Sequence, residues 1–310
     1  LKQENLTTPV TEFVLLGLTQ SSELQRFLFI VFSIVYLTTW LGNFTIITTV
    51  ITDRQLHTPM YFLLANLAFI DISDSTVSVP KMLSGLLSQR KTISFNECIL
   101  QMFFFHFIAG AMVFLLAVMA ADRYVAIHKP LRYLTIMNRG VCMGLVAGGF
   151  AHSIVQVALT IQLPFCGPNT LDNFYCDVPQ VIKLACTDTY MVELLMVSNS
   201  GLLTSIIFII LIVSYTVILV KIRTHVPEGK HKALSTCGAQ VVVVSIHFMP
   251  CIFIYALPFR KFSMDKAVSA LYTVITPMLN PMIYTLRNTE MKNAIKRLMN
   301  RVLDIFIYNI

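Results

Sequence analysis

The strongest constraint on this chain is a set of seven long stretches that contain no Asp, Glu, Lys or Arg. A helix needs about 20 mostly apolar residues to cross the roughly 30 Å hydrocarbon core of a bilayer. Because backbone groups in lipid must find hydrogen-bond partners within the chain, each stretch is expected to form a helix. The second stretch is short, but it continues past Asp71 and Asp74 to near Leu83. The seven stretches are Phe27–Thr52, Gln55–Ile70, Cys98–Ala121, Gly140–Leu171, Leu194–Val220, Ala233–Phe259 and Ala267–Leu286.

The composition agrees with a membrane protein. Of the 310 residues, 56% are hydrophobic and 13% are charged, whereas soluble domains average about 25% charged residues. These values exclude an ordinary soluble enzyme, a disordered chain and a small secreted disulfide-rich protein. A transmembrane barrel would show alternating segments of about ten residues, and the sequence has none. We therefore expect an all-α membrane protein with a single domain over residues 1–310, a seven-transmembrane helix bundle followed by a short amphipathic eighth helix.

The Lys and Arg residues between the stretches predict how the chain is oriented. The connecting segments on the side of the C-terminus hold 14 of them, and those on the opposite side hold nine. By the positive-inside rule, we expect a multi-pass plasma-membrane protein with residues 1–25 extracellular and residues 288–310 cytoplasmic. Residues 291–302 combine Lys and Arg with an apolar face, which predicts a helix lying on the inner leaflet. The net charge of +7 thus points to the bilayer as a partner and not to nucleic acid.

The expected extracellular side carries four cysteines and one glycosylation motif. Cysteines in an oxidising compartment usually pair, and four of them allow three connectivities that spacing alone does not separate. The motif is Asn5-Leu6-Thr7, which makes Asn5 a glycosylation acceptor unless the tripeptide arises by chance. The four cysteines are Cys98, Cys166, Cys176 and Cys186.

Five sequence blocks on the expected helices resemble one known family. They occur in the order LHTPMYF at 56–62, MAADRYVAI at 119–127, SY at 214–215, KALSTC at 232–237 and PMLNPMIY at 277–284. Together they resemble the odorant (olfactory) receptors of the tetrapod class II group, close to its fourth family, within the rhodopsin-like G-protein-coupled receptors. The resemblance extends from about Thr11 to Met299.

The resemblance implies a function and two disulfide bonds. It implies a receptor that binds a small, neutral or weakly polar volatile odorant in a transmembrane pocket on the extracellular side. It also implies activation of a stimulatory (olfactory-type) heterotrimeric G protein and a rise in cAMP, without enzymatic activity or a cofactor. The implied disulfides are Cys98–Cys176, which ties the third helix to the second extracellular loop, and Cys166–Cys186 within that loop. The loop is expected to cap the ligand cavity.

The resemblance also places a signalling site at the cytoplasmic end. Arg123 beside Asp122 is expected to hold a charge pair in the inactive state and to release it to the G protein; alone, such an arginine could simply extend to the interface. Asn43 and Asp71 are expected to form a polar hub with Asn280. Sodium binding is not expected at Asp71, because Met112 stands where relatives carry a second acid. The expected signalling residues are Asp122, Arg123, Tyr124, Tyr215, Lys232, Asn280, Pro281 and Tyr284.

The expected ligand cavity lies between the outer halves of the third, fifth, sixth and seventh helices. On the third helix the candidates follow the spacing of three and four residues that marks one helical face. A mostly apolar cavity with a few polar groups suits a small volatile molecule. His106, Asn199 and Tyr255 are the polar candidates, although a histidine in a bundle is as often a structural hydrogen-bonding residue. No charged side chain occupies these positions, and no metal site is expected. The candidates are Met102, Phe105, His106, Ala109, Gly110, Met196, Asn199, Ser200, Thr204, Phe248, Ile252, Tyr255 and Thr273.

Two other function classes fit a polytopic chain less well. A membrane transporter of a small molecule is the alternative, but it is expected to show paired repeats with broken helices, which this sequence lacks. An intramembrane enzyme needs a nucleophile with a base or a cluster of metal ligands. The seven histidines share no metal-ligand spacing.

Overall fold

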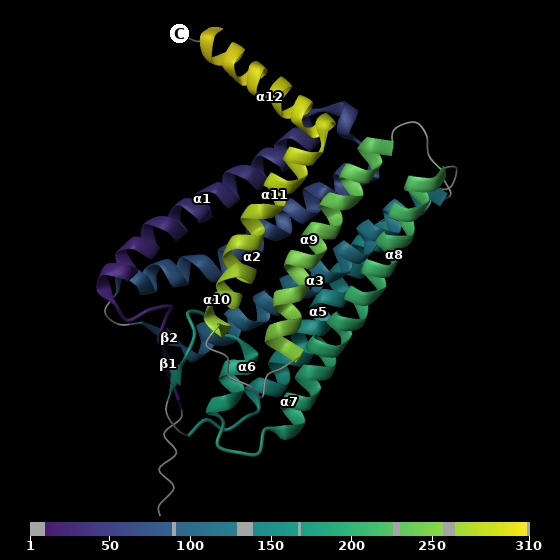
Figure 1. The fold of residues 1–310 in the computed structure, drawn as a ribbon. Coiled ribbons are helices and arrows are strands. Elements are labelled where there is room, and N and C mark those ends of the chain that lie inside the picture. Colours follow the sequence, from purple (N-terminus) through teal and green to yellow (C-terminus); the bar gives the residue numbers. More distant parts are fainter. Residues whose placement is uncertain are drawn as a thin grey trace, which may run out of the picture.

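The computed structural model describes residues 10–88, 91–128, 139–166, 169–225, 230–256 and 264–308. Long helices run side by side as a bundle (Figure 1), and they coincide with the seven apolar stretches. Two of them are divided by a π-helical turn: α7, η4 and α8 form one rod, and α10, η5 and α11 form another. The bounds are α1 Ser22–Thr52, α2 Pro59–Leu87, α3 Phe95–His128, α5 Arg139–Ile161, α7 Tyr190–Met196, η4 Val197–Leu202, α8 Leu203–His225, α9 Lys230–Ala256, α10 Asp265–Ala270, η5 Leu271–Ile275 and α11 Thr276–Arg287.

Within the described residues, five helical rods are long and apolar enough to cross a membrane by themselves. They comprise α1, α2, α3, the rod from α7 to α8, and α9. In α5 the described apolar part, Ala147–Ile161, is shorter than this length. The rod formed by α10, η5 and α11 is interrupted by the π-helical turn η5. The fold is the expected seven-helix bundle.

Several helix boundaries differ from the sequence prediction, and two of them have a clear physical reason. The second helix starts at Pro59 and not at Gln55, because Asp53 caps the short 3-10 helix η1, Arg54–Leu56, and proline favours the first turn of a helix. The fourth helix ends at Ile161 although the charge-free stretch continues for ten residues. Pro164 follows within three residues, and a proline disfavours helical backbone in the residue before it. An absence of charge is therefore compatible with a loop.

A three-stranded sheet closes one end of the bundle, which we call the sheet end. Strand β1, Glu12–Leu15, lies in the middle between β2, Thr92–Ser94, and β3, Thr170–Leu171. β1 pairs antiparallel with β2 and parallel with β3. The short helices α6, Val178–Val181, and η3, Ile182–Leu184, lie at the same end.

Helix α12, Thr289–Tyr308, lies at the opposite end of the bundle (Figure 1). Arg297 on α12 donates hydrogen bonds of 2.9 and 2.6 Å to one carboxylate oxygen of Asp53. The Tyr61 hydroxyl donates to Glu290 over 2.6 Å. These contacts attach the amphipathic helix to the ends of the first two helices.

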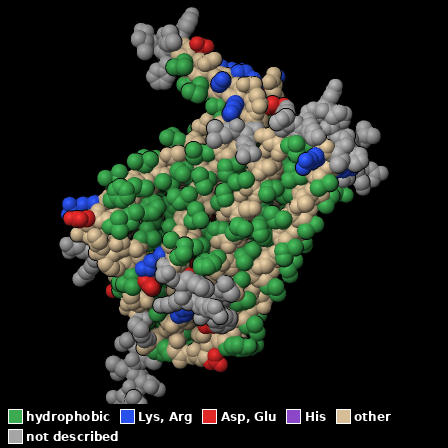
Figure 2. Space-filling view, viewed as in Figure 1, with side chains coloured by type: hydrophobic (Ala, Val, Ile, Leu, Met, Phe, Trp, Pro, Cys, Tyr) green, Lys and Arg blue, Asp and Glu red, His purple; other side chains and the backbone are tan. Residues whose placement is uncertain are grey.

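The flank of the bundle is apolar. Figure 2 shows hydrophobic side chains across the flank, with Lys and Arg near its two ends. On α1 alone, four large apolar side chains are 59% to 69% exposed: Phe27, Ile34, Leu37 and Leu41. Soluble monomers rarely expose apolar patches of this extent, so the flank is the surface that faces lipid.

Candidate functional site

A cavity of about 280 Å³ lies between α3, α5, the η4–α8 segment and α9, in the half of the bundle toward the sheet end. Seven residues that the sequence analysis assigned to the ligand site line it together. Three come from α3, three from η4 and α8, and one from α9. They are His106, Ala109, Gly110, Asn199, Ser200, Thr204 and Tyr255.

The other six candidates do not line this cavity. Phe105 packs on Tyr175, with ring centroids 5.2 Å apart. The Thr273 hydroxyl is used within its own helix, where it donates to the carbonyl of Ser269. The rest are packed in the apolar clusters of the bundle. One helical face carries both the residues that line a cavity and the residues that pack its walls together. These four are Met102, Met196, Phe248 and Ile252.

The sequence analysis missed the wall that α5 contributes. Gly148, His152 and Val155 line the cavity from that helix, and the His152 ring centroid lies 5.7 Å from that of His106. These three positions follow the spacing of four and three residues of one helical face. That pattern is present in the sequence, whereas the family resemblance implied a cavity between the other helices.

The π-helical turn η4 brings Asn199 and Ser200 to the cavity. A π-helical turn holds an extra residue and therefore turns the side chains that follow it relative to a regular helix. Gln156 on α5 donates a 2.8 Å hydrogen bond to the Ser200 hydroxyl. Gly201 permits the close approach of α9, since a Cβ atom there would lie 2.7 Å from the carbonyl oxygen of Tyr255.

A buried carboxylate lies next to the cavity, on a loop position that the sequence analysis did not consider. Asp177 has a side chain that is 2% exposed. Its oxygens accept hydrogen bonds from the hydroxyls of Tyr255, at 3.0 Å, and Tyr175, at 3.3 Å. The Nε2 atom of His106 lies 3.4 Å from Asp177 Oδ1. Asp177 follows Cys176 directly and lies on a loop, so no helical spacing relates it to the candidate positions.

Disulfide bonds fix the position of this loop. The structure contains Cys98–Cys176 and Cys166–Cys186, the two pairs that the resemblance implies. The first joins the start of α3 to the residue before Asp177. The loop therefore holds Asp177 over the cavity from a covalent anchor on the same helix that carries His106.

Two buried polar atoms in the cavity wall have no hydrogen-bond partner among the described residues. They are Nδ2 of Asn199 and Nε2 of His106, whose 3.4 Å approach to Asp177 Oδ1 lacks hydrogen-bond geometry. A buried polar group without a partner costs about 1–3 kcal/mol. The two atoms are therefore suited to receive a small molecule that offers hydrogen-bonding groups.

The expected signalling residues lie at the end of the bundle toward α12. The Arg123 guanidinium donates hydrogen bonds of 3.1 and 2.6 Å to one oxygen of Asp122. The buried hydroxyl of Tyr215 donates to Gln240 on α9 over 3.2 Å, and Tyr284 is buried nearby in the same apolar cluster. Tyr124 is exposed, Pro281 lies within α11, and Lys232 lies in α9 with its side chain outside the described residues.

The expected polar hub divides into two contacts. Asn280 donates to both carboxylate oxygens of Asp71, over 2.9 and 3.1 Å. Asn43 does not contact Asp71 by a described hydrogen bond; it donates instead to the backbone carbonyls of Thr39 and Pro277. The Asn280 contact joins α11 to α2, and the Asn43 contact with Pro277 joins α11 to α1.

Two further expectations concern glycosylation and metal binding. Asn5 lies outside the described residues. Among the described residues, no group of three or more His, Cys, Asp or Glu side chains is arranged to hold a metal ion.

Comparison with known proteins places this chain in a family. A sequence profile described as olfactory receptor matches residues 32–302. Olfactory receptor 4D1 of Homo sapiens is 61% identical over 296 residues, which cover 94% of this chain and 96% of that protein. Olfactory receptor 4Q2 of Homo sapiens is 56% identical (95% of each chain), and olfactory receptor 4E2 of Mus musculus is 55% identical (95% and 97%). The chain therefore belongs to the olfactory receptor family, a class of multi-pass membrane receptors without enzymatic activity.

Proposed function

We propose that the cavity beneath Asp177 is the odorant site and that it binds a small, neutral or weakly polar volatile molecule. The observation that carries the proposal is the cavity itself, whose wall is mostly apolar and includes two buried polar atoms. They are Nδ2 of Asn199, which has no hydrogen-bond partner among the described residues, and Nε2 of His106, which lies 3.4 Å from Asp177 Oδ1. Apolar contact supplies affinity at about 25 cal/mol per Å² of buried surface. The polar atoms supply orientation, and Asn199 Nδ2 favours a ligand that carries an oxygen acceptor.

The hydrogen bonds of Asp177 support a neutral ligand over an amine. Its carboxylate already accepts from the Tyr255 and Tyr175 hydroxyls and from the backbone N–H of Val178. A cationic ligand would compete with these donors for the same oxygens. A neutral ligand leaves them in place.

The signalling part of the proposal is that the receptor activates a stimulatory, olfactory-type G protein and raises cAMP. The Arg123–Asp122 pair is then a contact of the resting receptor, and its opening frees the arginine for the G protein. We propose that the sheet end is extracellular and the α12 end cytoplasmic. The excess of Lys and Arg in the segments on the α12 side supports this orientation.

An odorant panel applied to cells that express the receptor tests the proposal. At least one neutral odorant is expected to raise cAMP, and the response is expected to be lost in Arg123→Ala. Asn199→Leu is expected to raise the half-maximal odorant concentration about tenfold, as loss of one hydrogen bond worth about 1.4 kcal/mol predicts. The matched control is Asn66→Leu, because Asn66 is half-buried on α2, lies outside the cavity and donates its described hydrogen bond to the carbonyl of Phe62.

Two results would contradict the proposal. Equal shifts in Asn199→Leu and Asn66→Leu would remove Asn199 from the site. Saturable uptake of the odorant without any cAMP response would favour the transporter. Tags at the two ends, each tested for antibody access on intact cells, check the orientation; access to both or to neither excludes seven crossings.

A further inference from the structure

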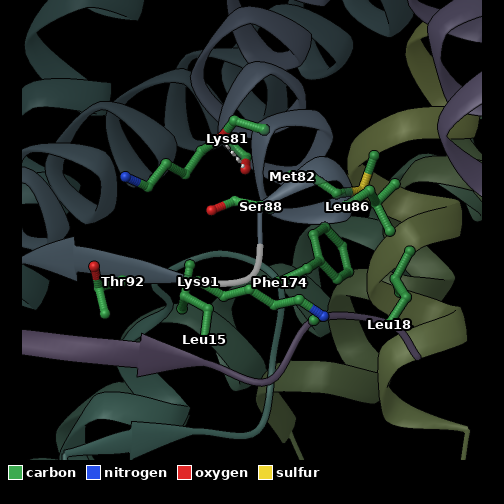
Figure 3. Close-up of a pocket in the computed structure, with 12 residues that line it drawn as sticks. Leu15, Leu18, Lys81, Met82, Leu86, Ser88, Lys91, Thr92 and Phe174 are labelled. Carbon is green, nitrogen blue, oxygen red and sulfur yellow. Dashed lines mark hydrogen bonds between the residues drawn. The ribbon is translucent and has the colours of Figure 1, made fainter. Parts of the chain in front are cut away.

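A second, smaller pocket lies at the sheet end and shares no lining residue with the odorant cavity. Its volume is about 160 Å³. Three segments form it: the chain before α1, the end of α2 with the start of β2, and the loop that precedes Cys176. The lining residues, drawn in Figure 3, are Leu15, Gly17, Leu18, Lys81, Met82, Ser84, Gly85, Leu86, Ser88, Lys91, Thr92 and Phe174.

The pocket has an apolar part and a polar part. Figure 3 shows Lys81, Ser88 and Thr92 toward one end, and Met82, Leu86 and Phe174 toward the other. The Lys91 ammonium group lies on the side of Phe174 and Leu18. Met82, Leu86 and Phe174 are all buried. A pocket of this kind favours a molecule with a short hydrocarbon chain and one polar head group.

The charge of the pocket selects the head group. Two acids at this end are already paired: Glu97 with Lys81, at 3.7 Å, and Asp172 with Lys266, at 2.6 Å. Lys91 pairs with no carboxylate among the described residues. The described contact of its Nζ atom is a 3.4 Å hydrogen bond to the backbone carbonyl of Thr19. The partly buried Lys91 ammonium group therefore leaves a positive charge that an anion would neutralise.

The size of the pocket limits the hydrocarbon chain. An apolar cavity of about 150 Å³ is known to hold a molecule of six carbons, which is close to the volume here. Position 85 gives additional room, since a Cβ atom built on Gly85 would meet no atom within 4 Å. A carboxylate with about four to six carbons fits both the volume and the charge.

We propose that this pocket is a second ligand site, which binds a short-chain carboxylate through Lys91 and modulates the response to the odorant. The site borders the odorant cavity through two adjacent loop residues. The ring of Phe174 lies 5.0 Å from that of Tyr175, and the Tyr175 hydroxyl donates to Asp177. A carboxylate against Phe174 thus acts on the loop that holds Asp177 over the cavity. Only this modulation rests on the proposed function, whereas binding itself does not.

Binding is tested by saturation-transfer NMR on the full-length receptor in phosphatidylcholine nanodiscs, with hexanoate and 1-hexanol as probes. Hexanoate is expected to bind about tenfold more tightly than 1-hexanol. Lys91→Gln is expected to weaken hexanoate about tenfold and leave 1-hexanol unchanged. Lys183→Gln is the matched control, because Lys183 is exposed in η3, outside the pocket.

A filling variant separates this pocket from any binding elsewhere. Gly85→Leu extends into open space and replaces glycine with a better helix former, so the fold is expected to be kept. Hexanoate and 1-hexanol signals from the pocket are both expected to disappear. Hexanoate binding that persists in both Lys91→Gln and Gly85→Leu would overturn the site.

Modulation is tested with any odorant that raises cAMP. Hexanoate is expected to shift the half-maximal odorant concentration at least threefold in the wild type and not in Lys91→Gln. Binding without such a shift would overturn the modulatory part alone. If the proposed odorant function fails, the receptor would still bind hexanoate by NMR but no odorant would raise cAMP.

Discussion

The hydroxyl oxygen of Tyr255 lies 3.0 Å from each carboxylate oxygen of Asp177, and both residues are almost fully buried. This contact joins α9 to a loop that is covalently bound to α3 through Cys98–Cys176. Any movement of the sheet end of α9 must therefore stretch this hydrogen bond or carry the loop with it. Tyr255 also lines the cavity, so a ligand bound there would contact the side chain whose hydrogen bond depends on the position of α9.

Tyr255→Phe removes this hydrogen bond and leaves the ring in place. Asp177 keeps its bonds from Tyr175 and Val178, so surface expression is expected to persist. A net hydrogen bond of about 1 kcal/mol predicts a shift of roughly fivefold in odorant potency, measured as a cAMP dose–response curve. Tyr36→Phe on α1 is the control, and superimposable curves for all three receptors would exclude a role for the contact.

Gly201→Ala is expected to destabilise the receptor. The added Cβ atom would lie 2.7 Å from the carbonyl oxygen of Tyr255, so η4 and α9 must move apart. Overpacking of this kind costs about 1–3 kcal/mol, which a lower midpoint of thermal unfolding in detergent would report. Gly144→Ala on α5 meets no atom within 4 Å and is expected to leave the midpoint unchanged or raise it.

The Asp53–Arg297 pair predicts a defined pH dependence. The Arg297 guanidinium lowers the pKa of the Asp53 carboxyl from its ordinary value of 3.8. A carboxyl whose pKa is lower in the folded state contributes stability above 3.8 and loses it as the pH falls through the lowered pKa. Arg297→Gln is therefore expected to cost at most about 1 kcal/mol at neutral pH and nothing in strong acid.

Thermal unfolding of the wild type and Arg297→Gln across a pH series checks this difference. Lys292→Gln is a matched control, because Lys292 is an exposed cation on the same helix. A difference between wild type and Arg297→Gln that stays constant into strong acid would show that the pair acts through packing and not through charge.

Basal signalling is expected to be insensitive to sodium. Both oxygens of Asp71 accept from Asn280, and the buried Met112 on α3 offers no second carboxylate. Basal cAMP is expected to be equal in sodium chloride and choline chloride at the same ionic strength. Met112→Glu supplies the missing acid and is expected to introduce a sodium response; strong sodium inhibition of the wild type would refute the argument.

Cys98→Ser is expected to keep the receptor inside the cell. The bond to Cys176 links residues 78 positions apart, and its loss costs about 4.5 kcal/mol by the chain-entropy estimate. Surface staining against total protein measures the retention. Cys237→Ser changes a buried cysteine that forms no disulfide and should reach the surface; normal trafficking of Cys98→Ser would show that the bridge is dispensable.

The helices were predictable because lipid excludes charged side chains. A membrane-spanning stretch is therefore recognised by its composition, whatever the order of the residues within it. The same rule cannot mark where a helix stops, which is why the fourth stretch was predicted ten residues too long. The sheet at the end of the bundle was not predicted at all. Its strands have two to four residues, too few for an alternating pattern to stand out.

About half of the predicted cavity residues line the cavity, and the reason lies in helix rotation. The period of α3 correctly grouped His106, Ala109 and Gly110 on one face. In the rod formed by α7, η4 and α8, the π-helical turn η4 shifts that period. The residue types at Asn199 and Ser200 do not predict such a turn. Asp177 was missed because it approaches from a loop, where no periodicity links it to Tyr255.

The middle position of β1 has a consequence for biosynthesis. A ribosome releases residues 12–15 long before residues 170–171, yet β1 is completed only when both β2 and β3 flank it. The earliest strand to emerge is thus among the last to be secured, and until then Phe13, which is buried in the folded chain, lacks the residues that cover it.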